Sequence, residues 1–277
     1  GVIERLRDVQ QSRRDGSGGQ IPDADLLAAG VREYARTFDR HAGGFGDAPK
    51  FPRPAELLFL LREHARTGDV EARQMVLETL RAMATGGMRD HVGGGFHRYS
   101  VDAAWRVPHF EKMLYDQAQL TLACLEAAQA AGDSSFATVA SDTLAYVRRE
   151  LSHADGGFFS AEDADSEGVE GTFYVWSLEE LRSVCGDDAA MAEDWYGVTA
   201  GGNFEGSNIL HRPVRGDLER PAAVERARQA LFARRETRVR PGLDDKVLTE
   251  WNGLMLATLA DAAMAMGRED WMEAARA

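Results

Sequence analysis

Side chains able to do acid–base chemistry gather in residues 105–117. Pro108 favours a helix start there, because proline is tolerated in the first helical turn. On such a helix His109, Lys112 and Asp116 follow one another at intervals of about one turn and share one side. Glu111 and Tyr115 share another side. A histidine beside a loop can act as an acid or base near neutral pH. We therefore predict catalytic roles for His109 and Glu111, and substrate contacts from Arg106, Tyr115 and Asp116. The alternative is a scaffold in which these residues cap the helix and pair with neighbouring loops.

A second group flanks the glycine run at residues 93–95. It consists of Asp90, His91, His97 and Arg98. His97 is a candidate base or sugar contact. Two histidines beside an aspartate also occur in metal sites, but the helical i, i+4 spacing of a zinc pair is absent. We therefore predict no metal site, and no cofactor.

Clustered carboxylates form a third group at residues 162–170. Asp163 is the catalytic candidate, because cleavage of a glycosidic bond needs one carboxylic acid and one carboxylate. A solvated loop held by salt bridges has the same composition. The run 163–168 lacks the remainder of a twelve-residue calcium loop. Catalysis, a structural role and metal binding all stay open here.

The remaining candidates lie near residues 50 and 250. Asp245 is a fifth catalytic candidate, and either Asp244 or Asp245 can cap the helix that follows. An aromatic ring face suits the C–H groups of a sugar, although core packing is the plainer role for tryptophan. From these two segments we expect four residues to bind substrate: Lys50, Phe51, Glu250 and Trp251. We expect the same role for Trp105, which lies in the first group.

Apolar residues at helical spacing predict the elements that would position these side chains. One helix is capped by Asp23 or Asp25 and runs to Phe38. Others are expected at about 54–66, 70–85, 109–131, 134–152, 177–185, 188–195, 221–236, 246–266 and from 271 onward. The one strand signal is the β-branched and aromatic run 172–176, which also fits a hairpin arm in a long loop.

Similar Gly-Gly-Phe connections recur after the first, third and fifth helices, beginning at residues 43, 94 and 156. Such quasi-periodicity indicates a repeated helical hairpin. If every unit packs alike, the long loops emerge at one end and the short turns, Gly68-Asp69 and Gly132-Asp133, at the other. Of 12 phenylalanines, eight lie in or beside the long loops: Phe45, Phe51, Phe96, Phe110, Phe158, Phe159, Phe173 and Phe204. They form either a binding face or a plug that closes the end of a ring.

Composition narrows the function classes. The 277 residues carry a net charge of −13, so the chain lacks the basic surface that nucleic acids or anionic lipids would need. No apolar run is long enough to span a membrane. Cys124 and Cys185 form no C-x-x-C motif, and this sparse use of cysteine fits a cytoplasmic protein. Cys124 should be buried and Cys185 exposed. Residues 1–20 are polar and glycine-rich, and we expect a tail or linker before a domain at 21–277.

Several long runs resemble the helical C-terminal region of the thioredoxin-domain-containing family known as the spermatogenesis-associated or YyaL-like proteins. The matching runs are Gly43–Pro52, Asp90–Ser100, Trp105–Gln117, Ser160–Ser166, Glu170–Trp176 and Asp244–Leu254. The resemblance implies an all-α (α/α)6 toroid, the six-hairpin architecture of N-acylglucosamine 2-epimerases and several glycoside hydrolases. Too few helices are predicted for a complete ring, so we expect it to be incomplete at the C-terminus. The resemblance also implies a thioredoxin-like domain upstream in full-length relatives.

Two functions remain open. The first is a carbohydrate-active domain, a sugar epimerase or isomerase or a glycosidase-type enzyme, with its site at the long-loop end. The second is a non-catalytic binding or scaffold module that partners the thioredoxin-like domain, and an incomplete ring could dimerise. The first depends on the long loops meeting on one rim around a shared hollow.

Overall fold

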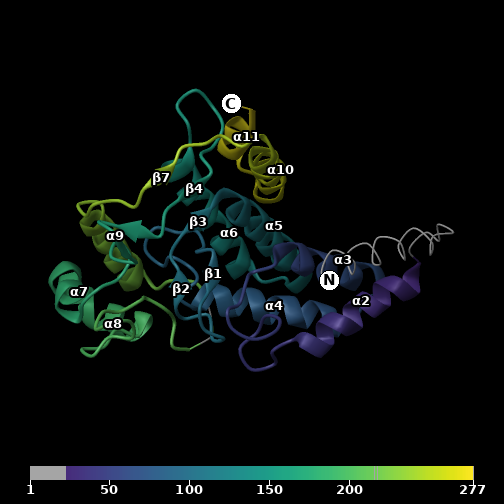
Figure 1. The fold of residues 1–277 in the computed structure, drawn as a ribbon, viewed down its shortest axis with the longest axis horizontal. Coiled ribbons are helices and arrows are strands. Elements are labelled where there is room, and N and C mark those ends of the chain that lie inside the picture. The colour runs from purple at the N-terminus through teal and green to yellow at the C-terminus, as the bar shows by residue number, and fades with distance from the viewer. Residues whose placement is uncertain (1–22, 215, 217, 277) are drawn as a thin grey trace, which may run out of the picture.

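Two layers of helices form the larger part of the molecule. The computed structural model describes residues 23–214, 216 and 218–276, and the expected tail at 1–20 lies outside them. Three helices pack side by side in one layer: α3 (Pro54–Thr67), α5 (Leu114–Ala131) and α10 (Thr249–Met266). The other layer holds α2 (Ala24–Thr37), α4 (Val70–Thr85), α6 (Ser134–Tyr146) and α11 (Glu269–Arg276) (Figure 1). A π-helical turn, η1 (Val147–Leu151), continues α6.

Local sequence explains the short turns between the layers. Gly68, Gly132 and Gly267 end α3, α5 and α10 in the left-handed conformation, which glycine adopts without steric cost. Asp69 and Asp133 then accept hydrogen bonds from the first backbone amides of α4 and α6. Each pair therefore folds as a tight helical hairpin. The all-α class and the layered hairpins of an (α/α) toroid are confirmed.

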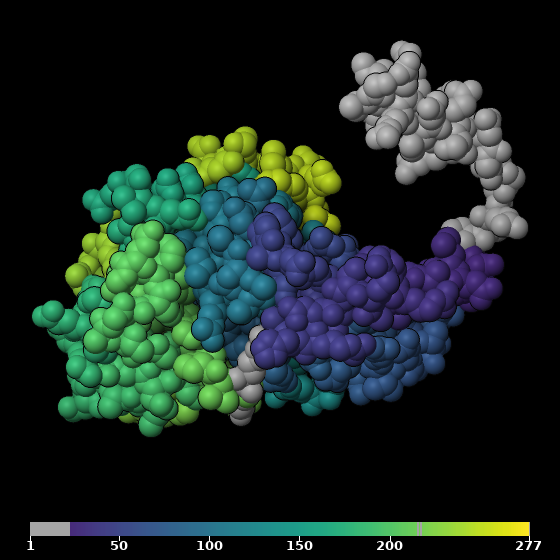
Figure 2. All heavy atoms as spheres, turned by 60° about the horizontal axis from the view of Figure 1, so that its bottom comes forward, coloured from purple at the N-terminus to yellow at the C-terminus, as the bar shows by residue number. Residues whose placement is uncertain are grey.

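A smaller lobe comes from the connection between α6 and α10. It contains α7 (Leu178–Cys185), a 3-10 turn η2 (Gly186–Asp188), α8 (Ala189–Tyr196) and α9 (Ala222–Arg235). These elements share a separate apolar core around Trp176, Leu181 and Tyr196. Figure 2 shows this green lobe beside the blue loop segments, while the purple α2 lies on the opposite side of the molecule.

Short strands in the long loops pair with one another at one end of the molecule. The strand β3 (Lys112–Met113) pairs antiparallel with β4 (Ala161–Glu162), which pairs with β7 (Leu243–Asp244). Two more antiparallel pairs, β1 (Tyr99–Ser100) with β2 (Pro108–His109) and β5 (Asp165–Ser166) with β6 (Val169–Glu170), complete the loop layer. A bridge from Lys50 to Ser100 joins the loop after α2. The expectation that the long loops meet on a common rim is confirmed.

Two predicted elements were wrong. The helix expected from residue 109 begins at Leu114, because residues 108–109 and 112–113 extend to pair with neighbouring strands. His109, Lys112 and Asp116 therefore do not share one side of a helix. The run 172–176 is a turn, except that Trp176 forms a single bridge to Asn208.

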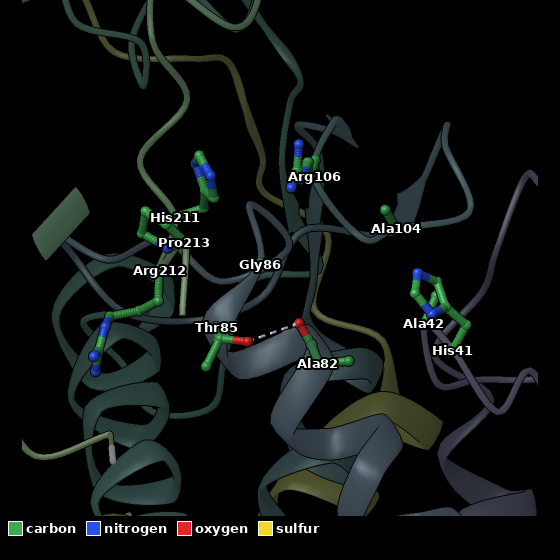
Figure 3. A pocket seen from close by; sticks show the side chains of 10 residues that line it. All are labelled: His41, Ala42, Ala82, Thr85, Gly86, Ala104, Arg106, His211, Arg212 and Pro213. Carbon is green, nitrogen blue, oxygen red and sulfur yellow. Dashed lines mark hydrogen bonds between the residues drawn. The ribbon is translucent and has the colours of Figure 1, made fainter. Parts of the chain in front are cut away.

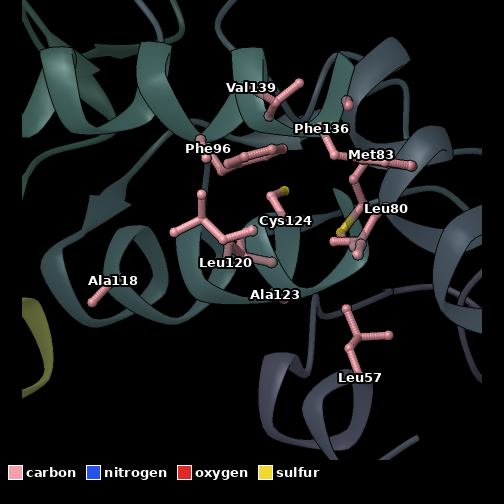
Figure 4. Close-up of a cluster of buried hydrophobic side chains, with 14 of the residues drawn as sticks. Leu57, Leu80, Met83, Phe96, Ala118, Leu120, Ala123, Cys124, Phe136 and Val139 are labelled. Atoms are coloured by element: carbon pink, nitrogen blue, oxygen red, sulfur yellow. The ribbon is translucent and has the colours of Figure 1, made fainter. Parts of the chain in front are cut away.

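The main core lies between the two helical layers. Figure 4 shows its centre, where Leu57 of α3, Leu80 and Met83 of α4, and Phe136 and Val139 of α6 surround residues of α5. The expectation that Cys124 is buried is confirmed, whereas Cys185, expected at the surface, is also buried. Its helix packs against α8 and α9 and turns this residue inward.

Most loop aromatics fill the space under the loops. Phe45, Phe96 and Phe158 join the main core, and Phe110 and Phe173 form a separate apolar cluster with Tyr174. Gly171, with a φ of +79°, allows the Phe110 ring to pack closely, because an added Cβ would lie 2.6 Å from that ring. These side chains act as the plug. Phe51 differs, because 46% of its surface is exposed at the rim.

Candidate functional site

A buried ion network lies under the loops. Asp90 accepts hydrogen bonds from Lys112 Nζ and from Arg235 Nη1, each at 2.8 Å, and all three side chains are buried. Burial alone would raise the pKa of Asp90, but the two cations hold it well below its ordinary value. Glu162, opposite Lys112 in the β3–β4 pair, accepts from the Tyr146 hydroxyl at 2.9 Å. The charged groups of this network are paired with one another, which is typical of a structural role.

His97 belongs to this network and not to an open site. Its Nδ1 lies 2.8 Å from the Phe110 carbonyl oxygen, and the rings of Phe110 and Tyr174 meet it edge to face. Burial, with the nearby Lys112 charge, lowers the pKa of His97 to about 3, so the ring stays neutral. The cavity beside it measures about 20 Å³, enough for a water molecule and too small for a sugar. The hollow expected at this point is filled.

Lys50 and Trp105 also have internal partners. The Lys50 ammonium is buried and donates to Asp39 Oδ2 at 2.6 Å and to the carbonyl oxygens of Gly43 and Ala103. Trp105 is fully buried and donates through Nε1 to the Gly43 carbonyl. The predicted substrate contacts do not fit these positions, because neither side chain presents a surface to a ligand.

Three acidic candidates lie at the surface. Asp163 follows β4, Asp245 follows β7, and Glu250 lies in the first turn of α10, all exposed. Asp244 pairs with Lys246 at 2.5 Å instead of capping α10, whose N-terminus has no side-chain cap. Arg106 is exposed and lines a different pocket, described below.

The other candidates come together on one surface at the loop end, which we call the rim site. It contains nine residues: Phe51, Arg98, Tyr99, His109, Glu111, Tyr115, Asp116, Glu170 and Trp251. Strand pairing brings several of these together, because the β1–β2 register sets Tyr99 opposite His109, and Arg98 donates its backbone amide to the Glu111 carbonyl. The rim site is therefore built by the loop 98–111 and the first turns of α5 and α10, with Phe51 from the loop after α2 and Glu170 from β6.

The centre of the rim site is a histidine held by a carboxylate. His109 Nδ1 lies 2.7 Å from Glu170 Oε1, and Glu170 also accepts from the Phe110 backbone amide. An ionised carboxylate only accepts hydrogen bonds, so Nδ1 is the donor to Glu170, and in the neutral form of the ring Nε2 carries the lone pair. Nε2 is 3.7 Å from Glu111 Oε2. This geometry prepares His109 Nε2 to accept a proton.

Aromatic rings flank the histidine on one side. The His109 ring stacks on Tyr99 with centroids 5.0 Å apart, and Tyr99 stacks on the exposed Phe51 at 4.8 Å. Beyond Glu111, Tyr115 meets Trp251 edge to face at 4.8 Å. Both edges of the site therefore offer half-buried or exposed aromatic surface.

Arg98 links the two edges. Its guanidinium donates to Glu111 Oε2 at 2.7 Å and forms a further hydrogen bond with the Tyr115 side chain. Burial raises the pKa of Tyr115, with a contribution from Asp116, so its hydroxyl keeps its proton. Fixed donors and acceptors thus lie between the aromatic edges, as hydroxyl recognition requires.

Asp116 is the unusual carboxylate of the rim site. It lies in the first turn of α5, its side chain is buried, and Oδ2 has no hydrogen-bond partner among the described residues. Burial raises the pKa of Asp116 to about 7; Arg98 opposes this rise and Glu111 adds to it. Near neutral pH this carboxyl is therefore poised between its acid and base forms, a property common at functional sites.

Replacing Asp116 with asparagine should stabilise the protein at alkaline pH. Folding raises this pKa, so wild-type stability falls as pH rises from about 4 to about 7, and the penalty persists above that range. The gain from Asp116→Asn should therefore be near zero at pH 4 and reach at most about 4 kcal/mol at pH 8. Urea unfolding at both pH values measures it. Asp261→Asn, at an exposed position of α10, is the control, and a pH-independent gain for Asp116→Asn would contradict the assignment.

Sequence reasoning gave no site role to three members of the rim site. Glu170 stands out only as one of several clustered acids, since its partner is 61 residues away in the chain. Tyr99 carries no signal until the β1–β2 register is known. Arg98 was seen as a flanking charge without a role. Within residues 23–276, apart from the two gaps, no three metal-binding side chains gather as a metal site. The helices of this part of the chain also lack the length and apolar composition of a membrane span.

Comparison with curated proteins gives clear relatives. The chain is 43% identical to human spermatogenesis-associated protein 20 over 84% of its length, and 42% identical to the mouse protein over 90%. It is 34% identical to an uncharacterized Caenorhabditis elegans protein over 86%. The chain spans about a third of the length of these relatives, 35%, 37% and 38% respectively. No family model matches the chain.

Solved structures give more distant similarities. A sugar epimerase from a ruminal bacterium aligns with a TM-score of 0.45 and 13% identity, covering 89% of this chain and 82% of its own. A D-mannose isomerase aligns with a TM-score of 0.44 and 14% identity, covering 93% and 69%. These scores are too low to carry an argument about the site.

Proposed function

From the rim site we propose that this chain, a member of the spermatogenesis-associated protein 20 family, is a carbohydrate-active domain of the isomerase or epimerase type. The name of the family states no reaction. The observation that carries the proposal is His109, fixed through Nδ1 by Glu170 with Nε2 available, on a surface edged by aromatic rings. Moving a proton at a carbon beside a carbonyl needs such a base together with a proton donor.

Two groups supply the acid and base roles in this proposal. His109 Nε2 takes a proton from the sugar, and Glu170 stabilises the imidazolium that forms. Asp116, with its pKa raised to about 7, is the candidate donor on the same rim. Arg98 and Glu111 hold sugar hydroxyls between these groups. Glycosidic cleavage by two free carboxylates has less support, because Glu111 is already paired with Arg98.

Trp251 provides the direct test of sugar binding. Its half-buried ring closes one edge of the rim site, and a stacked aromatic contributes about 0.5–1.5 kcal/mol beyond the buried area. Calorimetric titration with mono- and disaccharides should give saturable binding that Trp251→Ala weakens about tenfold. Trp195→Ala, in the smaller lobe, is the matched control and should bind normally. Absence of binding by the wild-type chain, or equal loss in both variants, would count against a carbohydrate site.

A binding module is the second candidate. The saturated network of Asp90, Lys112 and Arg235 favours it, because those side chains perform a structural role at the loop end. In that case the rim site would contact a protein segment such as the thioredoxin-like domain expected in longer relatives. Substitutions in the rim site would then change that association, and titration with sugars would show no binding. The cytoplasmic location and the dimer remain predictions from the sequence.

A further inference from the structure

A separate pocket lies where α4 ends. Its volume is about 320 Å³, and its lining includes His41, Thr85, Gly86, Arg106, His211 and Arg212. Figure 3 shows Arg106 and His211 on one side, His41 on another, and the end of α4 as the floor. None of the rim-site residues lines it.

The charge of this pocket is opposite to that of the chain. Among the residues that the structure describes, two arginines and two histidines line it and none of the lining residues is acidic, although the chain as a whole carries −13. A concave surface of one sign concentrates ligands of the opposite charge. The pocket therefore favours an anion even though the whole molecule repels one.

Arg106 is the unpaired cation of the pocket. It is exposed, and in the described part of the chain its guanidinium has no ion-pair or hydrogen-bond partner; the nearby Asp102 accepts from its backbone amide. Most other arginines here are paired, as Arg226 is with Asp188. Arg212 differs too, because its guanidinium stacks 3.5 Å from the Trp195 ring and turns away from the pocket (Figure 3). The five donors of Arg106 thus remain available.

His211 adds an oriented donor. Asn203 Oδ1 accepts from the Ile209 amide at 2.8 Å, which places Asn203 Nδ2 3.3 Å from His211 Nδ1. Nδ1 also lies 3.3 Å from the Ile209 carbonyl oxygen, so both contacts fix the position of the ring. In the tautomer in which Nδ1 accepts from Asn203, the imidazole proton lies on Nε2. Burial, with Arg106 close by, lowers the pKa of His211, so it acts as a neutral donor.

The helix end on the floor does not oppose an anion strongly. A helix C-terminus carries about half a negative charge on its last carbonyl oxygens. Here those oxygens already accept hydrogen bonds: Ala82 from the Gly86 amide, Thr85 from the Arg212 amide, and Gly86 from the His91 ring. The remaining negative potential is smaller than the full charge of Arg106.

We propose that this pocket binds a phosphate group, with Arg106 as the main ligand-binding residue and His211 as a second donor. Arginine presents paired N–H groups that match phosphate oxygens. The volume also accommodates a small polar molecule attached to the phosphate. The site is independent of the rim site and of the reaction proposed there.

Calorimetric titration with inorganic phosphate and with a phosphorylated monosaccharide tests the proposal. Wild-type protein should bind both saturably at neutral pH, and Arg106→Gln should weaken both about tenfold or more. Arg32→Gln, an exposed position of α2, makes the same charge change elsewhere and should leave affinity unchanged. Tighter binding of the sugar phosphate indicates a phosphomonoester as the ligand, and equal binding indicates phosphate itself.

Two results would overturn the proposal. One is a wild-type chain that binds neither probe. The other is an equal loss in Arg106→Gln and Arg32→Gln, which would mean a general charge effect. His211→Gln provides an independent measure, because the loss of one neutral donor should weaken binding severalfold without changing net charge.

Discussion

Replacing Asp90 with alanine is expected to lower the free energy of unfolding by about 3–5 kcal/mol, the cost of leaving buried charges unpaired. Lys112 and Arg235 both donate to this carboxylate, and neither ammonium nor guanidinium reaches water. Asp90 also accepts from the backbone amides of Val92 and Gly93. Its removal therefore leaves two buried cations without their counter-charge and two amides without their acceptor.

Chemical denaturation measures this loss, and a surface pair serves as the control. Asp188→Ala breaks the Arg226 pair at the surface and should lower the stability far less than Asp90→Ala, because water screens this pair. Because the folded pKa of Asp90 lies well below its ordinary value, its contribution is complete above about pH 4 and disappears only as pH falls through the folded pKa. The difference between wild type and Asp90→Ala should therefore be constant from pH 5 to pH 8. A small or strongly pH-dependent difference in that range would contradict the network.

The hairpins could be predicted because their signals are local. Gly68 with Asp69, and Gly132 with Asp133, end one helix and cap the next within two residues. The repeated Gly-Gly-Phe loops then place all long connections at one end. The start of α5 could not be predicted in this way. Residues 108–113 have helical spacing, but Glu162 and Tyr99 provide strand partners from distant loops, and pairing overrides local preference.

The candidate site residues likewise include some that the sequence predicts correctly and some that it does not. His109, Glu111, Tyr115, Asp116, Trp251 and Phe51 were found by residue type and do meet on one surface. His97, Lys50 and Trp105 have the same residue types but are buried with internal partners. Residue type alone does not distinguish a buried polar group from a binding one, because both need nearby charges. Only the contacts of each side chain separate them.

Replacing His109 with glutamine should have the largest effect on the proposed reaction. Glutamine keeps a polar side chain at the rim but cannot act as a base, and a general base contributes about 10²–10⁴ in rate. Proton removal beside a carbonyl exchanges that hydrogen with solvent, so incubation of aldoses in D₂O followed by proton NMR reports the step directly. We expect deuterium incorporation by the wild-type protein and a loss of about 10²-fold or more in His109→Gln.

Glu170 separates positioning from catalysis in the same assay. It contacts His109 Nδ1 and not the reacting atoms, so Glu170→Gln should retain part of the exchange and change its pH profile, because the imidazole loses the carboxylate that stabilises its charged form. His153→Gln, a half-buried loop histidine whose Nδ1 accepts from the Asp155 amide, is the matched control and should exchange at the wild-type rate. Equal rates in wild type and His109→Gln would exclude His109 as the base. A wild-type chain that binds sugars yet exchanges no hydrogen would leave the rim site a binding surface, because an acid–base site that accepts its substrate must move the proton.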